Sequence, residues 1–163
     1  MNKKVLYLHG LNSKLHDDRR LVLNKFNLDI QAPHIDYENE PNRLKELIGS
    51  FDADFVIGSS AGGLAGYYIS GFVQVPALLF NPALPFRNKM ESIPNLPNRN
   101  EYLQIVLGGQ DKVVPAIQTF EFLNQTLDSH APLSIHWIHP MEHQIPIKVF
   151  ENEVGHFLSQ INS

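Results

Sequence analysis

The stretch from Asp54 to Gly63 constrains the fold of this chain more than any other. It begins with three bulky residues, 55–57, two of them β-branched, which is typical of a short buried strand. A G-x-S-x-G pattern follows at residues 58–62, and residues 64–69 favour a helix. Glycine on both sides of the serine removes Cβ atoms that would collide with the adjoining strand and helix. The stretch therefore predicts a strained turn that lifts a serine hydroxyl above the sheet, at a helix start that favours negative charge.

Two serines compete for this position. Ser60 has glycine two residues away on each side, at Gly58 and Gly62, whereas Ser59 would have Ile57 and Ala61 there. Ser60 is therefore the candidate nucleophile. The same pattern also arises by chance in glycine-rich turns without chemistry, so the rest of the chain has to separate the two interpretations.

The composition limits the class of protein. The 163 residues suffice for one domain, 1–163, with a sizeable core. A net charge of −4 gives no basic field for nucleic acid, and no apolar stretch approaches the ~20 residues that a membrane helix needs. The absence of cysteine excludes a disulfide, a thiolate zinc site and a cysteine nucleophile, and the N-terminal apolar run is too short for a signal peptide. We expect a cytoplasmic protein that acts on a small-molecule substrate, with no nucleic-acid or membrane partner and an oligomeric state left open.

Strand-like and helical patterns alternate along the chain. Short apolar runs predict six strands, at residues 5–8, 28–32, 55–57, 75–80, 102–107 and 133–138. Helical spacing predicts a helix at 13–26, capped by Ser13 and burying Leu15, Leu21, Val22 and Phe26, and further helices at 41–49, 64–69, 115–127 and 146–161. The stretch 84–100, rich in proline and asparagine, is expected to be a functional loop. This alternation predicts an α/β fold with about six mostly parallel strands, helices on both faces, and ligands bound beyond the carboxyl ends of the strands.

Three kinds of side chain follow the predicted strands at those carboxyl ends. Ser60 follows the third strand, Asp111 the fifth, and histidines the sixth. A serine hydroxyl is a weak nucleophile until a neutral imidazole accepts its proton, and a carboxylate fixes the tautomer of that imidazole. The order Ser, Asp, His along the chain is the order found in α/β-hydrolases.

The chain resembles the α/β-hydrolase superfamily over its whole length and looks most like the small lid-less YqiA-type esterases. The resemblance rests on Tyr7-Leu8-His9-Gly10-Leu11-Asn12-Ser13, Gly58-Ser59-Ser60-Ala61-Gly62-Gly63, Asn81-Pro82-Ala83 and Gly108-Gly109-Gln110-Asp111. It implies a compact fold without a lid domain, and hydrolysis of short-chain acyl esters or thioesters without a cofactor. The residues that it implies are Ser60 as nucleophile, Asp111 as acid, His143 as base, and the amides of Leu11 and Ala61 as the oxyanion hole. One departure is Pro140-Met141-Glu142, where such families often have glycines before the histidine.

The choice of base among the eight histidines rests on the end of the last predicted strand. His136 lies within that strand, where alternation of faces keeps it from the sheet edge. His139 precedes Pro140, which holds it extended. His143 comes three residues later, far enough for a loop to carry it over Ser60, so we prefer it to the alternative His139. These three histidines could also suggest zinc, but no paired carboxylates with metal-ligand spacing accompany them, so we expect no metal site.

The favoured function is therefore that of a serine hydrolase acting on a carboxylic ester or acyl thioester. Two other interpretations stay open, a catalytically silent ligand-binding protein with the same fold and an amide or carbon–carbon hydrolase with the same triad. Leu84 and Phe86 are expected to form one wall of the substrate pocket. His9 is expected to be a structural hydrogen-bonding residue.

Overall fold

The computed structural model describes residues 1–89 and 96–162. Within this part of the chain, six strands form one sheet in the order β2-β1-β3-β4-β5-β6, and all neighbouring pairs are parallel. The strands are β1 (Lys4–Leu8), β2 (Asp29–Gln31), β3 (Phe55–Ser59), β4 (Ala77–Phe80), β5 (Leu103–Gly108) and β6 (Leu133–Ile138). The predicted α/β class with a parallel sheet is confirmed.

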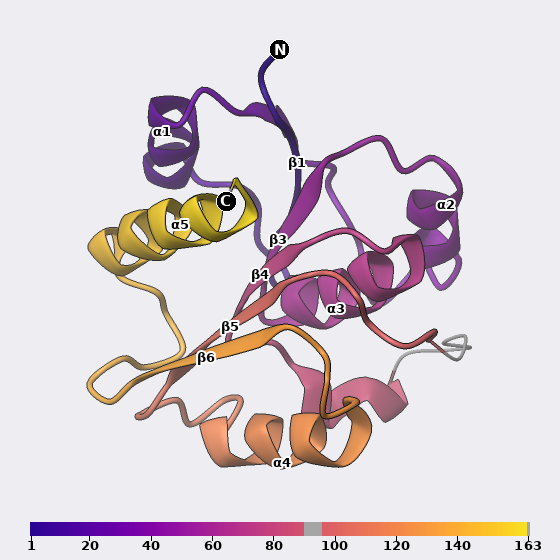
Figure 1. Cartoon of the computed structure of the whole chain (residues 1–163), viewed down its shortest axis with the longest axis vertical. Helices are drawn as coiled ribbons and strands as arrows, with labels where there is room; N and C mark the ends of the chain where they lie inside the picture. The colour runs from indigo at the N-terminus through magenta and orange to yellow at the C-terminus, as the bar shows by residue number, and fades with distance from the viewer. Residues whose placement is uncertain (90–95, 163) are drawn as a thin grey trace.

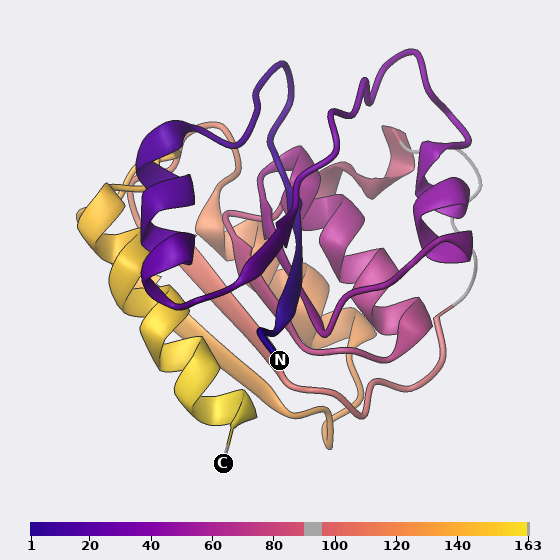
Figure 2. The same cartoon turned by 90° about the horizontal axis from the view of Figure 1, so that it is seen from above.

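Helices cover both faces of the sheet (Figures 1 and 2). One face carries α1 (Asp17–Lys25) and α5 (Ile147–Ile161), which pack side by side. The other face carries α2 (Arg43–Gly49), α3 (Ala61–Val73), the 3-10 helix η1 (Leu84–Lys89) and α4 (Ala116–Thr126). No helix within residues 1–89 and 96–162 is both long enough and apolar enough to cross a membrane.

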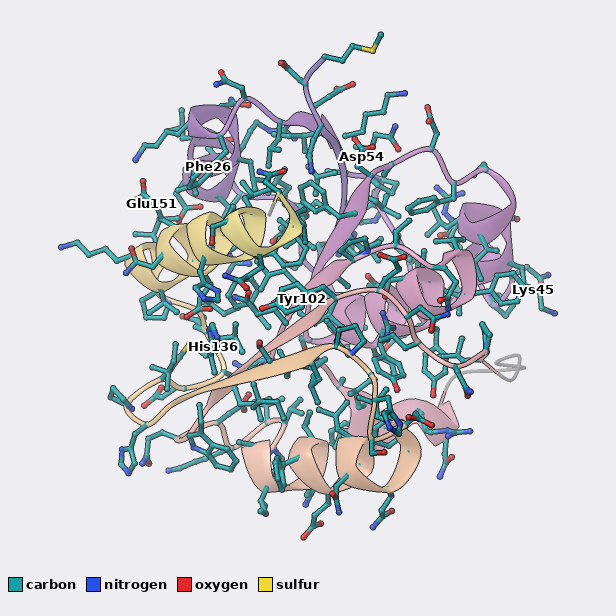
Figure 3. The ribbon with its side chains drawn as sticks, in the orientation of Figure 1. Phe26, Lys45, Asp54, Tyr102, His136 and Glu151 are labelled. Carbon is teal, nitrogen blue, oxygen red and sulfur yellow. The ribbon has the colours of Figure 1, made fainter. Side chains whose placement is uncertain are left out.

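The sheet separates two hydrophobic cores, because successive side chains of a strand point to opposite faces. In β1, Leu6 and Leu8 pack on the side of α3, whereas Val5 and Tyr7 pack on the side of α1 and α5. Figure 3 shows Glu151 of α5 close to the end of α1, where it forms an ion pair of 2.8 Å with Lys25. The two apolar cores hold the strand ends in fixed positions relative to one another.

The direction of strand addition reverses once, at β1. The chain passes from β1 through α1 on one face to β2, and then returns through α2 on the other face to β3, on the opposite side of β1. The loops that follow β1 and β3 therefore leave the sheet toward opposite faces. Such a reversal opens a crevice at the carboxyl ends of the two strands, where parallel sheets bind ligands.

Several element boundaries differ from the predictions. The first helix begins at Asp17, and its N-cap residue is His16, without a side-chain capping bond, so the predicted cap Ser13 is wrong. Leu21 is 64% exposed because Val22 and Leu23 occupy the buried side of that helix. The helix expected at 64–69 extends from Ala61 to Val73, because most of its residues are small or apolar enough to be buried against the sheet.

The stretch 84–100 is less irregular than expected. Its first six residues form η1, and Leu84 is fully buried in the core. Residues 90–95 lie outside the described part of the chain, and the residues from 96 to 100 form no helix or strand. The prediction of a single long loop is therefore wrong for Leu84–Lys89.

Candidate active site

The strained turn predicted around Ser60 is present between β3 and α3. Ser60 has φ 55° and ψ −117°, a combination that non-glycine residues rarely adopt. A Cβ atom on Gly58 would overlap the carbonyl oxygen of Gly62, and one on Gly62 would overlap the carbonyl oxygen of Leu8. Glycine is thus required at both positions by the close approach of β1, β3 and α3.

Hydrogen bonds hold Ser60 in this conformation, which costs on the order of 1–3 kcal/mol. Its N–H donates to the carbonyl oxygen of Phe80 at 3.0 Å. Its own carbonyl oxygen accepts the N–H groups of Leu64 and Ala83, each at 3.0 Å. The serine is therefore fixed by its own helix, by the end of β4 and by the segment that follows β4.

Ser60, His143 and Asp111 meet in one chain of hydrogen bonds. His143 Nε2 lies 3.1 Å from Ser60 Oγ, and His143 Nδ1 lies 2.7 Å from Asp111 Oδ2. The Asp111 side chain is completely buried, whereas that of His143 is 26% exposed. The three residues come from the carboxyl ends of β3 and β5 and from the loop after β6, so the fold brings them together from distant parts of the sequence.

Main-chain groups fix the orientation of the Asp111 carboxylate. Its Oδ1 accepts the N–H of Val113 at 2.8 Å and the N–H of Val114 at 2.9 Å, which leaves Oδ2 for His143. A carboxylate only accepts hydrogen bonds, so His143 Nδ1 carries the proton and Nε2 presents its lone pair to Ser60. This is the tautomer in which an imidazole can remove the proton of a serine hydroxyl.

Leu11 and Ala61, the residues expected to supply the oxyanion-hole amides, lie beside the same cavity. Both residues line the cavity that contains Ser60, and a Cβ atom on neighbouring Gly10 would lie only 3.5 Å from Ser60 Cβ. In residues 1–89 and 96–162 neither N–H donates a hydrogen bond. Backbone N–H groups that have no partner in this part of the chain can stabilise an oxyanion when they are directed at it.

The loop that carries Leu11 is held by His9, which is buried. His9 Nδ1–H donates to the carbonyl oxygen of Gly10 at 2.7 Å, and Nε2 accepts the N–H of Ile35 at 2.9 Å. The hydroxyl of Tyr37 donates to the carbonyl oxygen of His9 at 2.6 Å. Burial raises the pKa of Tyr37, so its hydroxyl keeps the donated proton. His9 thus has the structural position that the sequence predicted.

A cavity of about 660 Å³ opens beside Ser60. Apolar side chains form most of its wall, among them Ile35, Leu44, Leu64, Phe86 and Val114. Charged side chains also line it, namely Glu38, Glu40 and Arg43. Phe86 takes part in the wall as expected, but Leu84 does not, because its side chain is buried in the hydrophobic core.

The other histidines near the last strand lie away from Ser60. His139 is exposed and, among the described residues, forms no hydrogen bond with Ser60 or Asp111. His136 lies on the side of β6 that faces α5 (Figure 3), and its Nδ1 lies 2.5 Å from Glu153 Oε2. Within residues 1–89 and 96–162, no group of three or more His, Cys, Asp or Glu side chains is arranged to hold a metal ion.

Sequence reasoning gave no role to one buried polar residue of the site. Asn81 follows β4, and its side-chain amide bonds to the main chain of Gly108, Glu142 and His143. Asn81 also has a positive φ of 41°, which asparagine tolerates better than most residues. The sequence signal for it is the Asn-Pro pair directly after a buried strand, which indicates a turn but not its partners.

Comparisons with known proteins agree with this architecture. The model of an uncharacterised protein family, UPF0227, matches residues 4–107, which include Ser60 but not Asp111 or His143. No curated protein sequence matches the chain.

Solved structures resemble it over nearly the whole length. Est1E from Butyrivibrio proteoclasticus has a TM-score of 0.74 at 15% identity, covering 99% of this chain and 89% of its own. MGS-MChE2, an alpha/beta hydrolase enzyme from a lagoon-sediment metagenome, has a TM-score of 0.76 at 14% identity, covering 100% and 93%. SOBER1 from Arabidopsis thaliana has a TM-score of 0.67 at 15% identity, covering 97% and 100%. At these identities the likeness establishes a shared fold, and with the family match it shows that this chain belongs to the UPF0227 family and has the α/β-hydrolase fold.

Proposed function

We propose that the protein is a serine hydrolase that cleaves carboxylic ester or acyl thioester bonds of small acyl substrates. The observation that carries the proposal is the chain of hydrogen bonds from Ser60 Oγ through His143 to the buried carboxylate of Asp111. The strained backbone of Ser60 supports it, because such strain persists where the surrounding structure enforces it and clusters at active sites.

The proposed reaction is an acyl transfer in two steps. Ser60 Oγ attacks the carbonyl carbon of the substrate while His143 Nε2 accepts the hydroxyl proton, and Asp111 stabilises the imidazolium. The N–H groups of Leu11 and Ala61 hold the oxyanion of the tetrahedral intermediate. This intermediate collapses when His143 returns the proton to the departing alkoxide or thiolate, which leaves an acyl-serine. Water then attacks the acyl-serine while His143 accepts its proton, and His143 returns this proton to Ser60 Oγ as the acyl–Oγ bond breaks and the carboxylic acid leaves.

The cavity supports a small substrate with an apolar acyl group. Its volume of about 660 Å³ is within the range of small-molecule sites, and its wall is mainly apolar. The triad itself does not distinguish an ester from a thioester, because both reactions need the same nucleophile, base and oxyanion donors. A cytoplasmic location remains a proposal, supported by the absence of cysteine.

Hydrolysis of p-nitrophenyl esters of graded chain length tests the proposal. Wild type should be active, Ser60→Ala should lose about 10³-fold or more of kcat, and Ser59→Ala should lose far less. If both variants fold and lose kcat equally, the assignment of Ser60 as the nucleophile is wrong. No turnover of any ester or thioester by the wild type would favour the silent binding protein, and turnover of amides or carbon–carbon bonds alone would favour the other hydrolase.

A further inference from the structure

The end of β4 and the segment that follows it contact Ser60, the main chain of His143, and Gly108, which ends the strand leading to Asp111. β4 lies between β3 and β5 in the sheet (Figure 1), so its carboxyl end is next to the ends that carry Ser60 and lead to Asp111. On the β3 side, Phe80 accepts the N–H of Ser60 and Ala83 donates to the Ser60 carbonyl oxygen. The residue between them in sequence that turns toward β5 and β6 is Asn81.

The side-chain amide of Asn81 joins the end of β5, the strand that leads to Asp111, to the loop between β6 and α5. This loop, residues 139–146, carries His143 and is called the base loop here. Its Oδ1 accepts the N–H of Gly108, the last residue of β5, at 2.7 Å. Its Nδ2 donates to the carbonyl oxygens of Glu142 and His143, each at 3.1 Å. The opposite amide orientation would place an oxygen against two carbonyl oxygens and an NH₂ group against an N–H, so the partners determine the orientation.

Asn81 itself is firmly held. Only 2% of its surface is exposed, and its own N–H donates to the carbonyl oxygen of Val106 at 2.8 Å. All its side-chain hydrogen-bonding groups are therefore directed at neighbouring main chain rather than at solvent. A buried, fully bonded amide of this kind fixes the relative positions of the segments that it joins.

Met141 and Ile145 anchor the base loop in the core on either side of His143, but few hydrogen bonds reach the main chain of this loop near the imidazole. Its beginning is fixed by the bonds of Met141 N–H to Ile138 and of Gln110 N–H to Met141. In residues 1–89 and 96–162, the bonds from Asn81 are the only hydrogen bonds to the main chain of Glu142 and His143. The side chain of Asn81 thus supplies the hydrogen bonds that hold the main chain of the residue that carries the imidazole.

We propose that Asn81 is a positioning residue that sets His143 against both Ser60 and Asp111. Its kinetic consequence rests on the proposed hydrolase function. Asp111 lies three residues after Gly108 and donates its N–H to the Gly108 carbonyl oxygen at 3.2 Å. The Asn81 side chain therefore holds the base loop against the same strand end that positions Asp111. Misplacing a catalytic group by about 1 Å can lower the rate about 10²-fold.

Two substitutions and one matched control test the proposal. Asn81→Gly tolerates the positive φ but removes every side-chain bond, and Asn81→Asp keeps the acceptor for Gly108 but loses the amide donors. The control is Gln104→Leu, because Gln104 is also fully buried on β5 and its amide bonds to Glu153 and His156 instead of the base loop. All three variants are compared with wild type for Tm, kcat and KM on one p-nitrophenyl ester.

Both Asn81 variants should lose about 10²-fold of kcat with KM unchanged within about threefold. Gln104→Leu should lower Tm but keep kcat within about threefold of wild type. A wild-type kcat in Asn81→Gly, or an equal loss of kcat in Gln104→Leu, would overturn the positioning role.

A spectroscopic readout separates this proposal from the proposed function. In ¹⁵N spectra of the imidazole, wild-type His143 should show one tautomer with a hydrogen-bonded Nδ1–H, and Asn81→Gly should lose this signature. If wild type hydrolyses no ester while the signature changes as expected, the hydrolase proposal fails and the positioning of His143 stands. An unchanged His143 signature in Asn81→Gly would overturn the positioning role whatever the enzymatic result.

Discussion

The two oxygens of the Asp111 carboxylate have different partners, so the effect of Asp111→Asn can be worked out from the structure. Oδ1 accepts the N–H groups of Val113 and Val114, and Oδ2 accepts Nδ1–H of His143. The new amide has one oxygen and one NH₂ group. It can direct the oxygen at the main chain or at the histidine, but not at both.

The first orientation keeps both main-chain bonds but turns the NH₂ group toward His143. The imidazole must then carry its proton on Nε2, where it cannot accept the proton of Ser60. The second orientation restores the useful tautomer but sets NH₂ against two N–H donors, losing two hydrogen bonds at about 1–3 kcal/mol each. The productive state is therefore disfavoured by about 2–6 kcal/mol, or roughly 30-fold to 10⁴-fold.

We expect kcat of Asp111→Asn on a p-nitrophenyl ester to fall within that range, with the fold retained because the first orientation preserves the main-chain bonds. The matched control is Asp128→Asn, since Asp128 Oδ1 likewise contacts a main-chain N–H and the Nδ1 of a histidine, both from His130, but at the surface. The control should keep wild-type activity. A kcat for Asp111→Asn within about threefold of wild type would refute the assignment of the tautomer to this carboxylate.

Two further outcomes follow from the structure. His143→Ala should abolish ester hydrolysis while His139→Ala retains most of it, and the reverse pattern in kcat measurements would exchange their roles. Burial raises the pKa of Tyr37 above its ordinary 10.0, so the folded state holds this proton more tightly than the unfolded state. The stability that this provides is complete below pH 10.0 and is lost as the pH rises above it, so urea unfolding between pH 8 and 11 should show a smaller loss of stability in Tyr37→Phe than in wild type. Equal losses in the two proteins would contradict the contribution of this hydroxyl.

The sequence was most informative where a residue type is forced by the backbone. Gly58 and Gly62 identified Ser60 because any Cβ at those positions would collide with the main chain, and the resulting G-x-S-x-G pattern can be recognised in a short stretch of sequence. The meeting of a serine, an aspartate and a histidine at one edge of the sheet could be anticipated because parallel strands bring their carboxyl ends to the same edge. The meeting of Ser60, Asp111 and His143 in the structure follows from these two features, while their catalytic roles remain proposals.

The sequence was least informative where tertiary contacts choose among similar patterns. The first helix begins at Asp17 because Val22 and the following leucine reach the core, and nothing local rules out the earlier start at Ser13 or the burial of Leu21. Asn81 shows the same limit at the site. Its place in a turn is visible from the Asn-Pro pair, but its bonds to the base loop join residues about sixty positions apart in the sequence.

Covalent labelling with a fluorophosphonate followed by mass-spectrometric mapping tests most directly whether this chain contains an activated serine. Only a serine paired with a working base reacts readily, so the wild-type protein should carry one adduct, on Ser60. His143→Ala, with its fold intact, should remain unlabelled. An unlabelled wild-type protein, or an adduct on Ser59 or any other residue, would contradict the proposal that Ser60 is the nucleophile of a hydrolase.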